Sequence, residues 1–382
     1  MILLVGNYAP DRQESMLRFA SMMQTGLAGR GLEARMLSPT PLFGRSFSST
    51  ISGIGKWMAY IDKYVLFPAT LSRACNEASR SSARPVLHIC DHSNAVYAKS
   101  RSRIRTLVTC HDLGAVRGAL GEATECPASQ MGQLLQRWIA TGLGRADLIA
   151  CDSTATRHDV ERLVRTDRGK VPKTRTILLG QNAPYHRLTD EETTSRLQDA
   201  APQLLDRPFV LNVGSSLARK NREGVLRIFA RIQAGWPGML VFAGEALPDS
   251  FVELGKRLGI SDRVVQIANP SNSVLEALYN RAYALLFPSK FEGFGWPLIE
   301  AQACGCPVLC SDAGSLGEVA GDSAFVRPWE AEESFAAELN DWIAHEPKRH
   351  EWIRLGTHNV ERFRTERMID DYVSAYRELG VA

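Results

Sequence analysis

Short apolar runs alternate with helical patterns from one end of the chain to the other. Those in the first half cover residues 2–6, 33–37, 86–90, 105–110 and 148–151, and those in the second half cover 209–213, 239–243, 264–267, 284–287 and 308–310. Between the first two runs, Ala20, Met23 and Leu27 recur at helical spacing, and Gly29 and Gly31 predict the end of that helix. Strands that alternate with helices are typical of parallel sheets. The pattern therefore predicts an α/β fold.

Chain length and one polar stretch predict two domains. At 382 residues the chain exceeds the size of one ordinary core. The segment 189–207 is polar, with Pro202 inside it and Pro208 directly after it, and we expect it to be a linker. The expected domains are residues 1–190 and 206–365. Ligands of such sheets bind outside the carboxyl ends of the strands, so we expect the site in a cleft between the domains.

Composition narrows the classes of protein that fit. An excess of three positive charges, with a pI near 8.4, gives no reason to expect a nucleic-acid partner. No run approaches the roughly 20 apolar residues that span a bilayer. Residues 1–6 lack the charged start of a signal peptide. We therefore expect a cytoplasmic protein.

The eight cysteines are spread over both halves, which in a chain without a secretion signal favours reduced thiols over disulfides. Cys304, Cys306 and Cys310 form the only cluster. A metal site would need a second pair with histidine at regular spacing, and the sequence has none. We expect these cysteines to be small buried packing residues, and we expect no metal.

The most informative segment, 288–301, joins an apolar strand to a helix through glycines. Gly293 and Gly295 let the backbone turn, and a proline stands at the start of the helix. Unpaired N–H groups at a helix N-terminus favour an anion such as a diphosphate. Glu292 and Glu300 could then accept hydrogen bonds from sugar or ribose hydroxyls. Solvated surface acids are the alternative, but the surrounding glycines favour a nucleotide-sugar site.

A second glycine turn follows the strand 209–213. Gly214 is followed by the adjacent cations Arg219 and Lys220, and Asn221 stands before the next helix. Cations at this point can neutralise a diphosphate, although a basic pair after a strand is usually only solvated surface. Neither first turn shows the G-x-G-x-x-G of a dinucleotide-binding dehydrogenase.

Histidines lie at two strand ends in the first half. His111 follows the strand 105–110 directly, where an open sheet presents functional groups. His88 and His92 flank the end of the strand 86–90, with Asn94 close by, and either histidine is a further candidate for the cleft. A lone histidine is more often structural or solvated, which is the alternative for each of them.

Together these segments resemble the retaining glycosyltransferases of family 4, of the bacterial polysaccharide type. The likeness rests on Glu292 and Glu300, which match the family's Glu, seven residues, Glu signature, and continues through 303–309 to 317–322. The segment 111–113, His-Asp-Leu, is similar to another family segment. The resemblance implies the GT-B fold, with two Rossmann-like domains facing across a cleft and the final helix, 366–382, packed on the first domain.

The resemblance also implies a role for each candidate residue. Arg219 and Lys220 would hold the donor phosphates and stabilise the departing nucleoside diphosphate. Glu292 and His111 would place the sugar, and Glu300 would hold the ribose. Retention by front-side attack would need no protein nucleophile, no metal and no cofactor. Further donor contacts are expected at Gly214, Asn221, Asn269, Gly293, Phe294 and Gly295.

Two segments of the first half leave alternatives open. Residues 11–15 replace a glycine pair of the family, so either this loop, with Ser15, serves the acceptor together with Asn94, or the second domain holds the donor almost alone. The segment 56–68 places on one helical face Trp57, Tyr60, Ile61 and Tyr64. Packing on the first domain is one interpretation. The other is an interfacial helix that touches a membrane, with Lys56 and Lys63 beside it and Trp57 near a lipid-linked acceptor.

These expectations describe a metal-independent retaining hexosyltransferase, cytoplasmic or peripheral at the inner face of the membrane. It would move a hexose from a nucleoside-diphosphate sugar to a growing polysaccharide or a lipid-linked oligosaccharide. The likeness to bacterial polysaccharide enzymes favours GDP-mannose as the donor. The rival hypothesis is a catalytically inactive, sugar-nucleotide-binding scaffold subunit of a polysaccharide assembly complex, supported by the altered loop 11–15.

Overall fold

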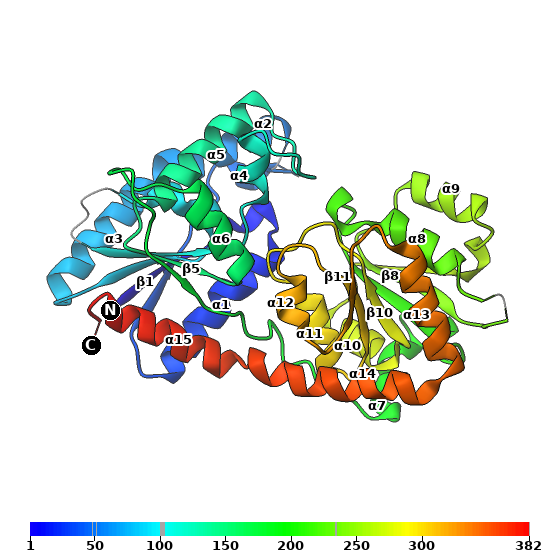
Figure 1. Cartoon of the computed structure of the whole chain (residues 1–382). Helices are drawn as coiled ribbons and strands as arrows, with labels where there is room; N and C mark the ends of the chain where they lie inside the picture. The colour runs from blue at the N-terminus through cyan, green and yellow to red at the C-terminus, as the bar shows by residue number, and fades with distance from the viewer. Residues whose placement is uncertain (48, 51, 100–103, 234, 382) are drawn as a thin grey trace. The chain divides into compact units, whose positions relative to one another are not determined.

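Two six-stranded parallel sheets, each flanked by helices, make up the protein (Figure 1). The computed structural model describes the chain except for Ser48, Ile51, residues 100–103, Ala234 and Ala382. The chain forms two compact units. Unit 1 contains Met1–Asn182 together with Thr365–Ala382, and unit 2 contains Ala183–Arg364. The α/β fold class is thus confirmed.

The sheet of unit 1 has the strand order β2-β1-β3-β4-β5-β6. Its strands are β1 (Ile2–Val5), β2 (Ala34–Leu37), β3 (Val86–Ile89), β4 (Arg105–Cys110), β5 (Leu148–Cys151) and β6 (Thr174–Thr176). Its α-helices are α1 (Glu14–Gly29), α2 (Gly53–Ile61), α3 (Phe67–Ser81), α4 (Gly114–Ala119), α5 (Gln130–Leu143), α6 (Thr154–Leu163) and α15 (Thr365–Glu378). A π-helix, η3 (Asp62–Leu66), joins α2 to α3, and there are 3-10 turns at η1 (Ala9–Asp11), η2 (Gly44–Ser46) and η4 (His92–Tyr97).

The sheet of unit 2 has the order β12-β11-β10-β7-β8-β9. Its strands are β7 (Phe209–Gly214), β8 (Met239–Gly244), β9 (Val264–Ala268), β10 (Ala284–Phe287), β11 (Val308–Ser311) and β12 (Phe325–Arg327). Its α-helices are α7 (Asp190–Gln198), α8 (Arg222–Ala230), α9 (Asp249–Arg257), α10 (Asn272–Arg281), α11 (Trp296–Ala303), α12 (Leu316–Ala320), α13 (Glu332–Ala344) and α14 (Glu346–Asn359). The 3-10 turns are η5 (Pro202–Leu204), η6 (Ala218–Lys220), η7 (Ser261–Arg263) and η8 (Val360–Phe363).

All ten strands expected from apolar runs are present, with ends that differ by at most one residue. The sequence analysis missed β6 and β12, which form the outer edges of the two sheets. Each is only three residues long, and β6 contains no apolar residue. A central strand gives a clear apolar run because helices bury both of its faces, whereas an edge strand does not need one. The other two edge strands, β2 and β9, contain enough apolar residues to be predicted. Cys304, Cys306 and Cys310 are buried free thiols, as expected.

The expected linker at 189–207 is wrong. Thr189 caps α7 in a capping box with Glu192, and α7 packs against α10 inside unit 2. Leu197 and Leu204 are fully buried, so the segment is part of the core of unit 2. Its polar residues misled the sequence analysis because α7 is amphipathic and exposes its charged face. The chain passes between the units at Asn182 and again at Arg364.

Helix α15 returns to unit 1 and packs against α1. The phenol of Tyr376 lies 2.6 Å from Nδ1 of His88, whose Nε2 lies 2.8 Å from the hydroxyl of Thr109. Tyr372 bonds the same Thr109 hydroxyl at 2.8 Å. Burial, together with the charge of His111, lowers the pKa of His88 to about 3, so this imidazole is neutral. The expectation that His88 lines a ligand site is therefore wrong, because it is a buried link between β3, β4 and α15.

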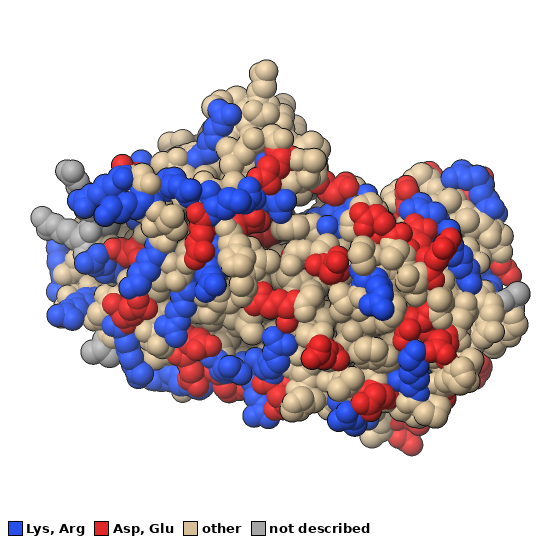
Figure 2. Space-filling view, viewed as in Figure 1, with Lys and Arg blue, Asp and Glu red and all other residues tan. Residues whose placement is uncertain are grey.

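The two units carry opposite net charge. Unit 1 has 26 Lys and Arg residues against 18 Asp and Glu, whereas unit 2 has 19 against 24. The net charges are therefore +8 and −5, which together give the +3 of the whole chain. Figure 2 shows Lys and Arg side chains spread over the visible face of unit 1. Such an asymmetry favours an anionic partner for unit 1.

Two glycines of α5 provide a matched test of close packing. A Cβ added to Gly142 would lie 2.1 Å from the backbone carbonyl oxygen of Ala95 in η4, whereas one added to Gly132 would meet only ordinary contacts. We expect Gly142→Ala to lower the free energy of unfolding by about 1–3 kcal/mol through overpacking. Gly132→Ala should leave it unchanged or raise it by up to about 1 kcal/mol. Denaturant unfolding of both variants checks this, and equal stabilities would contradict the close approach of α5 to η4.

Candidate functional site

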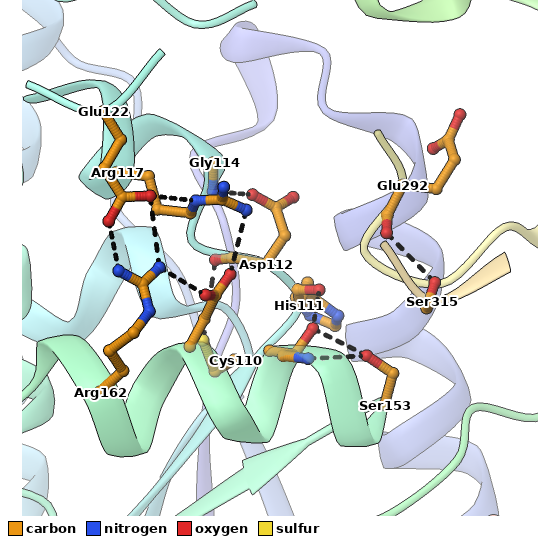
Figure 3. Close-up of polar contacts among 12 residues, drawn as sticks. Cys110, His111, Asp112, Gly114, Arg117, Glu122, Ser153, Arg162, Glu292 and Ser315 are labelled. Atoms are coloured by element: carbon orange, nitrogen blue, oxygen red, sulfur yellow. Dashed lines mark hydrogen bonds and ion pairs between the residues drawn. The ribbon is translucent and has the colours of Figure 1, made fainter. Parts of the chain in front are cut away.

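The glycine loop between β10 and α11 is held by its own backbone. Gly295 has φ +100°, and a Cβ there would lie 2.5 Å from Leu316, so the turn into α11 requires glycine. The hydroxyl of Ser315 donates to the carbonyl oxygen of Glu292 at 3.1 Å (Figure 3). It also lies 2.8 Å from the carbonyl oxygen of Phe294. A Cβ on Gly314 would lie 2.2 Å from the same Glu292 carbonyl oxygen. The loop therefore has one defined path before α11 begins.

Glu292 is a buried carboxylate that pairs with both expected cations. Its Oε1 lies 2.6 Å from Nζ of Lys220, and its Oε2 lies 2.9 Å from Nη1 of Arg219. Burial by itself would raise the pKa of Glu292, but the charges of Lys220 and Arg219 outweigh it and hold that pKa below its usual value. Burial lowers the pKa of Lys220 against the opposing effect of Glu292. The three residues form one ionic cluster around a buried carboxylate.

The turn after β7 is tied to the glycine loop at several points. Asn221 adopts a left-handed conformation, with φ 51°, and its side-chain amide donates to the carbonyl of Pro288 at 3.0 Å. The backbone N–H of Lys290 donates to the carbonyl of Arg219 at 2.7 Å. Both segments follow neighbouring strands, β7 and β10, whose carboxyl ends meet at one edge of the sheet. The structure thus brings together two motifs that are about 70 residues apart in the sequence.

Gly214 lies at the base of this turn, with φ +150°. Arg222, which is almost fully buried, donates to the carbonyls of Gly214 and Glu245 and to the hydroxyl of Ser216. A Cβ on Gly244 would lie 2.1 Å from the Gly214 carbonyl oxygen. The ends of β7 and β8 therefore pack backbone to backbone. The sequence analysis missed Arg222, which fixes the turn that carries Arg219 and Lys220.

Glu300 lies inside α11 and is 4% exposed. Its Oε2 accepts a hydrogen bond from the phenol of Tyr279 at 2.8 Å. Burial and the charge of Glu300 raise the pKa of Tyr279 well above its usual value, so the phenol keeps its proton. Tyr279 was not expected from the sequence, because an isolated tyrosine in α10 carries no signal of its partner.

Of the other residues expected to bind the donor, Asn269 is exposed and the ring of Phe294 is buried. Asn269 is exposed at the end of β9, with φ 47°, and its N–H donates to the carbonyl of Gly244 at 2.7 Å. The ring of Phe294 is buried against Trp296 and Phe363. Phe294 therefore anchors the loop in the core, and only its backbone is suited to face a ligand. Gly293 lies between Glu292 and this anchor.

In unit 1, His111 is buried where β4 ends. Its Nδ1 lies 2.8 Å from Oδ2 of Asp152, and its Nε2 lies 2.9 Å from the carbonyl oxygen of Cys90. The edge of the Phe19 ring packs on the imidazole, with a centroid distance of 5.0 Å and an interplanar angle of 83°. Both ring nitrogens are engaged within unit 1, so the expected contact of His111 with a sugar stays a prediction.

Burial alone would lower the pKa of His111, but the hydrogen bond and charge of Asp152 raise it to about 9, with help from Asp91. Burial raises the pKa of Asp152, although His111 opposes this shift. We therefore regard the imidazole as protonated at neutral pH. Asp152 is the first residue after β5, and His111 is the first residue after the neighbouring strand β4. The sequence could have predicted the pair from these matching positions at two strand ends.

A second polar cluster lies where β1 and β3 end. The side chain of Asn94 donates to Oδ1 of Asn7 at 2.9 Å, and Asn7 donates to Asp91 and Gln13. Asn94 is 7% exposed, so its amide is largely used inside the protein. Ser15, in contrast, is exposed in the first turn of α1. The cluster fixes the start of α1 relative to the sheet.

The acidic loop 11–15 is neutralised from within unit 1. Asp11 accepts from Nζ of Lys63 at 2.8 Å and from the hydroxyl of Thr50 at 2.8 Å. Lys63 is 9% exposed, and the rings of Tyr8, Tyr60 and Tyr64 lie 5.2 to 5.9 Å from its ammonium. Of the two lysines that the membrane alternative placed beside the helix, Lys63 lies inside unit 1 and pairs with Asp11, so it does not support that alternative.

The structure gathers the expected residues into two groups, one in each unit. Unit 2 holds Arg219, Lys220, Glu292 and Glu300, and unit 1 holds His111 and Asn94. Among the residues that the structure describes, no group of three or more His, Cys, Asp or Glu side chains could hold a metal ion. Within the same residues, no helix is long and apolar enough to cross a membrane.

The buried Glu292 predicts a specific pH dependence of stability. Its pKa is lowered in the folded protein, so it adds stability above the unfolded value of about 4.5, and this contribution is lost as the pH falls below that value. Glu292→Gln removes the titrating group and leaves two partly buried cations without their carboxylate, and we expect it to cost about 3 kcal/mol at pH 7. The difference from wild type should shrink as the pH falls to 3. Denaturant unfolding at several pH values measures it, with Glu253→Gln in exposed helix α9 as the control. A difference that stays constant with pH would contradict the cluster.

Comparisons with known proteins agree with this geometry. Residues 195–358, all within unit 2, match the family model of glycosyl transferases group 1. A D-inositol 3-phosphate glycosyltransferase of Rhodococcus erythropolis (strain PR4 / NBRC 100887) is 26% identical over 298 residues, which cover 74% of this chain and 65% of the relative. An O-antigen chain mannosyltransferase B of Escherichia coli is 25% identical over 284 residues, covering 72% of this chain and 71% of the relative. The match thus spans less than two thirds of the first relative.

Solved structures resemble the chain over almost its whole length. A sucrose-phosphate synthase from Thermosynechococcus elongatus has a TM-score of 0.75 and 19% identity, covering 99% of this chain and 98% of its own. Anabaena HepE, solved in complex with UDP, has a TM-score of 0.71 and 14% identity, covering 99% and 100%. At these identities the likeness establishes the fold, and the expected GT-B class is confirmed. The match over residues 195–358, which is less than half of the chain, makes this segment similar to the glycosyl transferases group 1 family.

Proposed function

We propose that the protein is a glycosyltransferase that moves a hexose from a nucleoside-diphosphate sugar to a polysaccharide or a lipid-linked oligosaccharide. The observation that carries the proposal is the cluster of Arg219, Lys220 and Glu292, within a domain matched by the group 1 family. The two cations provide charge for a diphosphate, and the carboxylate provides acceptors for sugar hydroxyls. A diphosphate that enters would compete with Glu292 for both cations and release its carboxylate oxygens for the sugar.

We propose that transfer proceeds with retention and without a metal. Arg219 and Lys220 supply the positive charge that a departing diphosphate needs, and the N-terminus of α11 adds to it. No protein nucleophile is needed when the leaving phosphate helps to deprotonate the acceptor. The relatives point to two different donor nucleotides. The relative from Escherichia coli is named a mannosyltransferase, which supports our choice of GDP-mannose, whereas HepE was solved with UDP.

Ligand-induced stabilisation tests the donor class. We expect one of UDP, GDP, TDP and ADP, at millimolar concentration, to raise the midpoint of thermal unfolding, because a ligand that binds only the native state stabilises it by about 3 kcal/mol at a hundred times its Kd. GDP is the expected one. Glu300→Ala should abolish the shift, because Glu300 is the expected partner of the ribose. Glu253→Ala, which removes an exposed glutamate of the same unit, should keep it.

A transfer assay distinguishes the hypothesis of an active glycosyltransferase from that of an inactive scaffold subunit. Glu292→Gln and His111→Ala should each reduce transfer by about a hundredfold or more if they place the sugar. Nucleotide binding without transfer by the wild type would favour the inactive scaffold subunit. No stabilisation by any nucleotide would argue against both hypotheses.

We also propose that unit 1 contacts an anionic membrane surface, where a lipid-linked acceptor would reside. The specific observation is a set of exposed apolar side chains on α2, η3 and α5. Helices α2 and α5 lie in the same part of unit 1 (Figure 1). The members of this set, the apolar face of unit 1, are each at least 43% exposed, namely Ile54, Trp57, Val65, Met131, Leu134 and Trp138. The rings of Trp57, Tyr60, Tyr64 and Trp138 form a continuous chain with centroid distances of 5.2 to 5.7 Å. Clustered exposed apolar side chains on a unit of charge +8 fit an anionic lipid surface.

Vesicle sedimentation tests this contact. We expect the wild type to bind vesicles that contain anionic phospholipid, and the double variant Trp57→Ser, Trp138→Ser to bind at least about tenfold more weakly, because two apolar anchors are lost. Val252→Ser, at an exposed apolar position of α9 in unit 2, is the control and should bind as the wild type does. The proposal would be overturned if the wild type did not bind such vesicles but formed dimers that the double variant cannot form. The apolar face would then bind a second copy of the chain.

A further inference from the structure

Three neighbouring strands of unit 1 end at one buried hydrogen-bonded group. Cys90, His111 and Asp152 are the first residues after β3, β4 and β5, which lie side by side in the sheet. The imidazole of His111 joins the other two, with Nε2 2.9 Å from the Cys90 carbonyl oxygen and Nδ1 2.8 Å from Oδ2 of Asp152. His111 is 6% exposed and Asp152 is 1% exposed. This edge of the sheet is where an open parallel fold binds its ligands.

Hydrogen-bond chemistry determines where the protons are. A carbonyl oxygen only accepts, so Nε2 of His111 must carry a hydrogen. A bare ring nitrogen and a carboxylate oxygen both only accept, so the 2.8 Å contact between Nδ1 and Asp152 needs a second proton between them. Neither ring nitrogen then has a free lone pair. His111 therefore cannot act as a general base in this arrangement.

The surrounding charges favour the protonated ring. Asp91, whose pKa is lowered by His92, His111 and hydrogen bonds against the effect of burial, stays ionised nearby. His88 is neutral and adds no charge. The thiols of Cys90 and Cys110 and the phenol of Tyr372 keep their protons because burial raises each pKa. Together with Asp152, these surroundings raise the pKa of His111 to about 9.

We propose that Asp152 is a positioning residue of the transfer reaction, which holds His111 in one orientation as a fixed hydrogen-bond donor and prevents it from acting as a base. The donor is Nε2–H, which the Cys90 carbonyl aligns and which a sugar hydroxyl can share. This inference rests on the proposed glycosyltransferase function. Nothing in the family match or in the named relatives assigns a role to Asp152.

Asp152→Asn is the informative substitution because it preserves the shape of the pair. The amide of asparagine can donate to Nδ1 of a neutral ring, which leaves the Nε2–H and its bond to Cys90 in place. A purely structural clamp would therefore work as well with Asn as with Asp. A positioning role that depends on the protonated ring would be lost with Asn. Asp147→Asn is the matched control, because Asp147 lies at the opposite end of β5 and bonds Arg105 and the N–H of Thr106.

Nuclear magnetic resonance of the histidine rings tests the pair without any assay of activity. With His111 assigned by comparison with His111→Gln, we expect its ring in the wild type to stay protonated at pH 8 and to titrate near pH 9. In Asp152→Asn the midpoint should fall below the ordinary value of about 6.5. A wild-type ring that is already neutral at pH 7 would overturn the proposal.

Transfer kinetics test the catalytic part. We expect Asp152→Asn to lower kcat about tenfold, with the donor KM changed less than about twofold, and to move the high-pH limb of the rate profile to lower pH. Asp152→Glu, which restores a carboxylate, should recover that limb even if its stability is reduced, and Asp147→Asn should keep the wild-type profile. Unchanged kcat and pH profile in Asp152→Asn would overturn the positioning role alone. Absence of transfer by the wild type would overturn the proposed function and with it this role, whereas the ring titration would still decide the state of the pair.

Discussion

A carboxylate that is buried beside two cations is the interaction on which the arrangement of unit 2 depends. Glu292 is 6% exposed, and the charges of Lys220 and Arg219 hold its pKa below the usual value against the effect of burial, while Glu292 in turn opposes the lowering of the Lys220 pKa by burial. The cluster needs the turn after β7 and the loop after β10 at one sheet edge. Arg222, Asn221 and Ser315 hold the backbone of these segments in place. The polar network and the path of the backbone therefore determine each other.

Unit 1 also stabilises a buried charged group through a partner, here His111 with Asp152. His111 and Asp152 share a proton between two neighbouring strand ends, and the carbonyl of Cys90 fixes the remaining N–H. Behind them, complete burial and the charge of His111 lower the pKa of His88 and keep it neutral, and its ring nitrogens lie at the hydroxyls of Tyr376 and Thr109. Two buried histidines on adjacent strands thus differ in charge because one has a carboxylate partner and the other has only hydroxyls. The contrast explains why burial alone does not predict the charge of a histidine.

The polar side chains at the strand ends are held by hydrogen bonds. The apolar face of unit 1, in contrast, stays exposed among the residues that the structure describes. Lys63 and Asp11 turn toward each other inside the unit, which removes charge from the surface next to α2. The exposed rings of Trp57 and Trp138 remain on the outside. Within unit 1, η3 carries both Lys63, which is 9% exposed, and Val65, which is 65% exposed.

The sequence by itself determined the α/β class, ten of the twelve strands and the residues of the Glu292 loop and the basic turn. It could do so because helices bury both faces of a central parallel strand and because sharp turns at strand ends need glycine, and both requirements leave local patterns. It failed at 189–207, where polar composition hid a packed helix, and at β6 and β12, where edge strands need no apolar run. Only the tertiary structure decided which side chains meet. The pairs of Glu292 with Arg219 and Lys220, of Glu300 with Tyr279 and of His111 with Asp152 join residues that are 21 to 73 positions apart. Such contacts depend on the order of strands in the sheet, which no local pattern encodes.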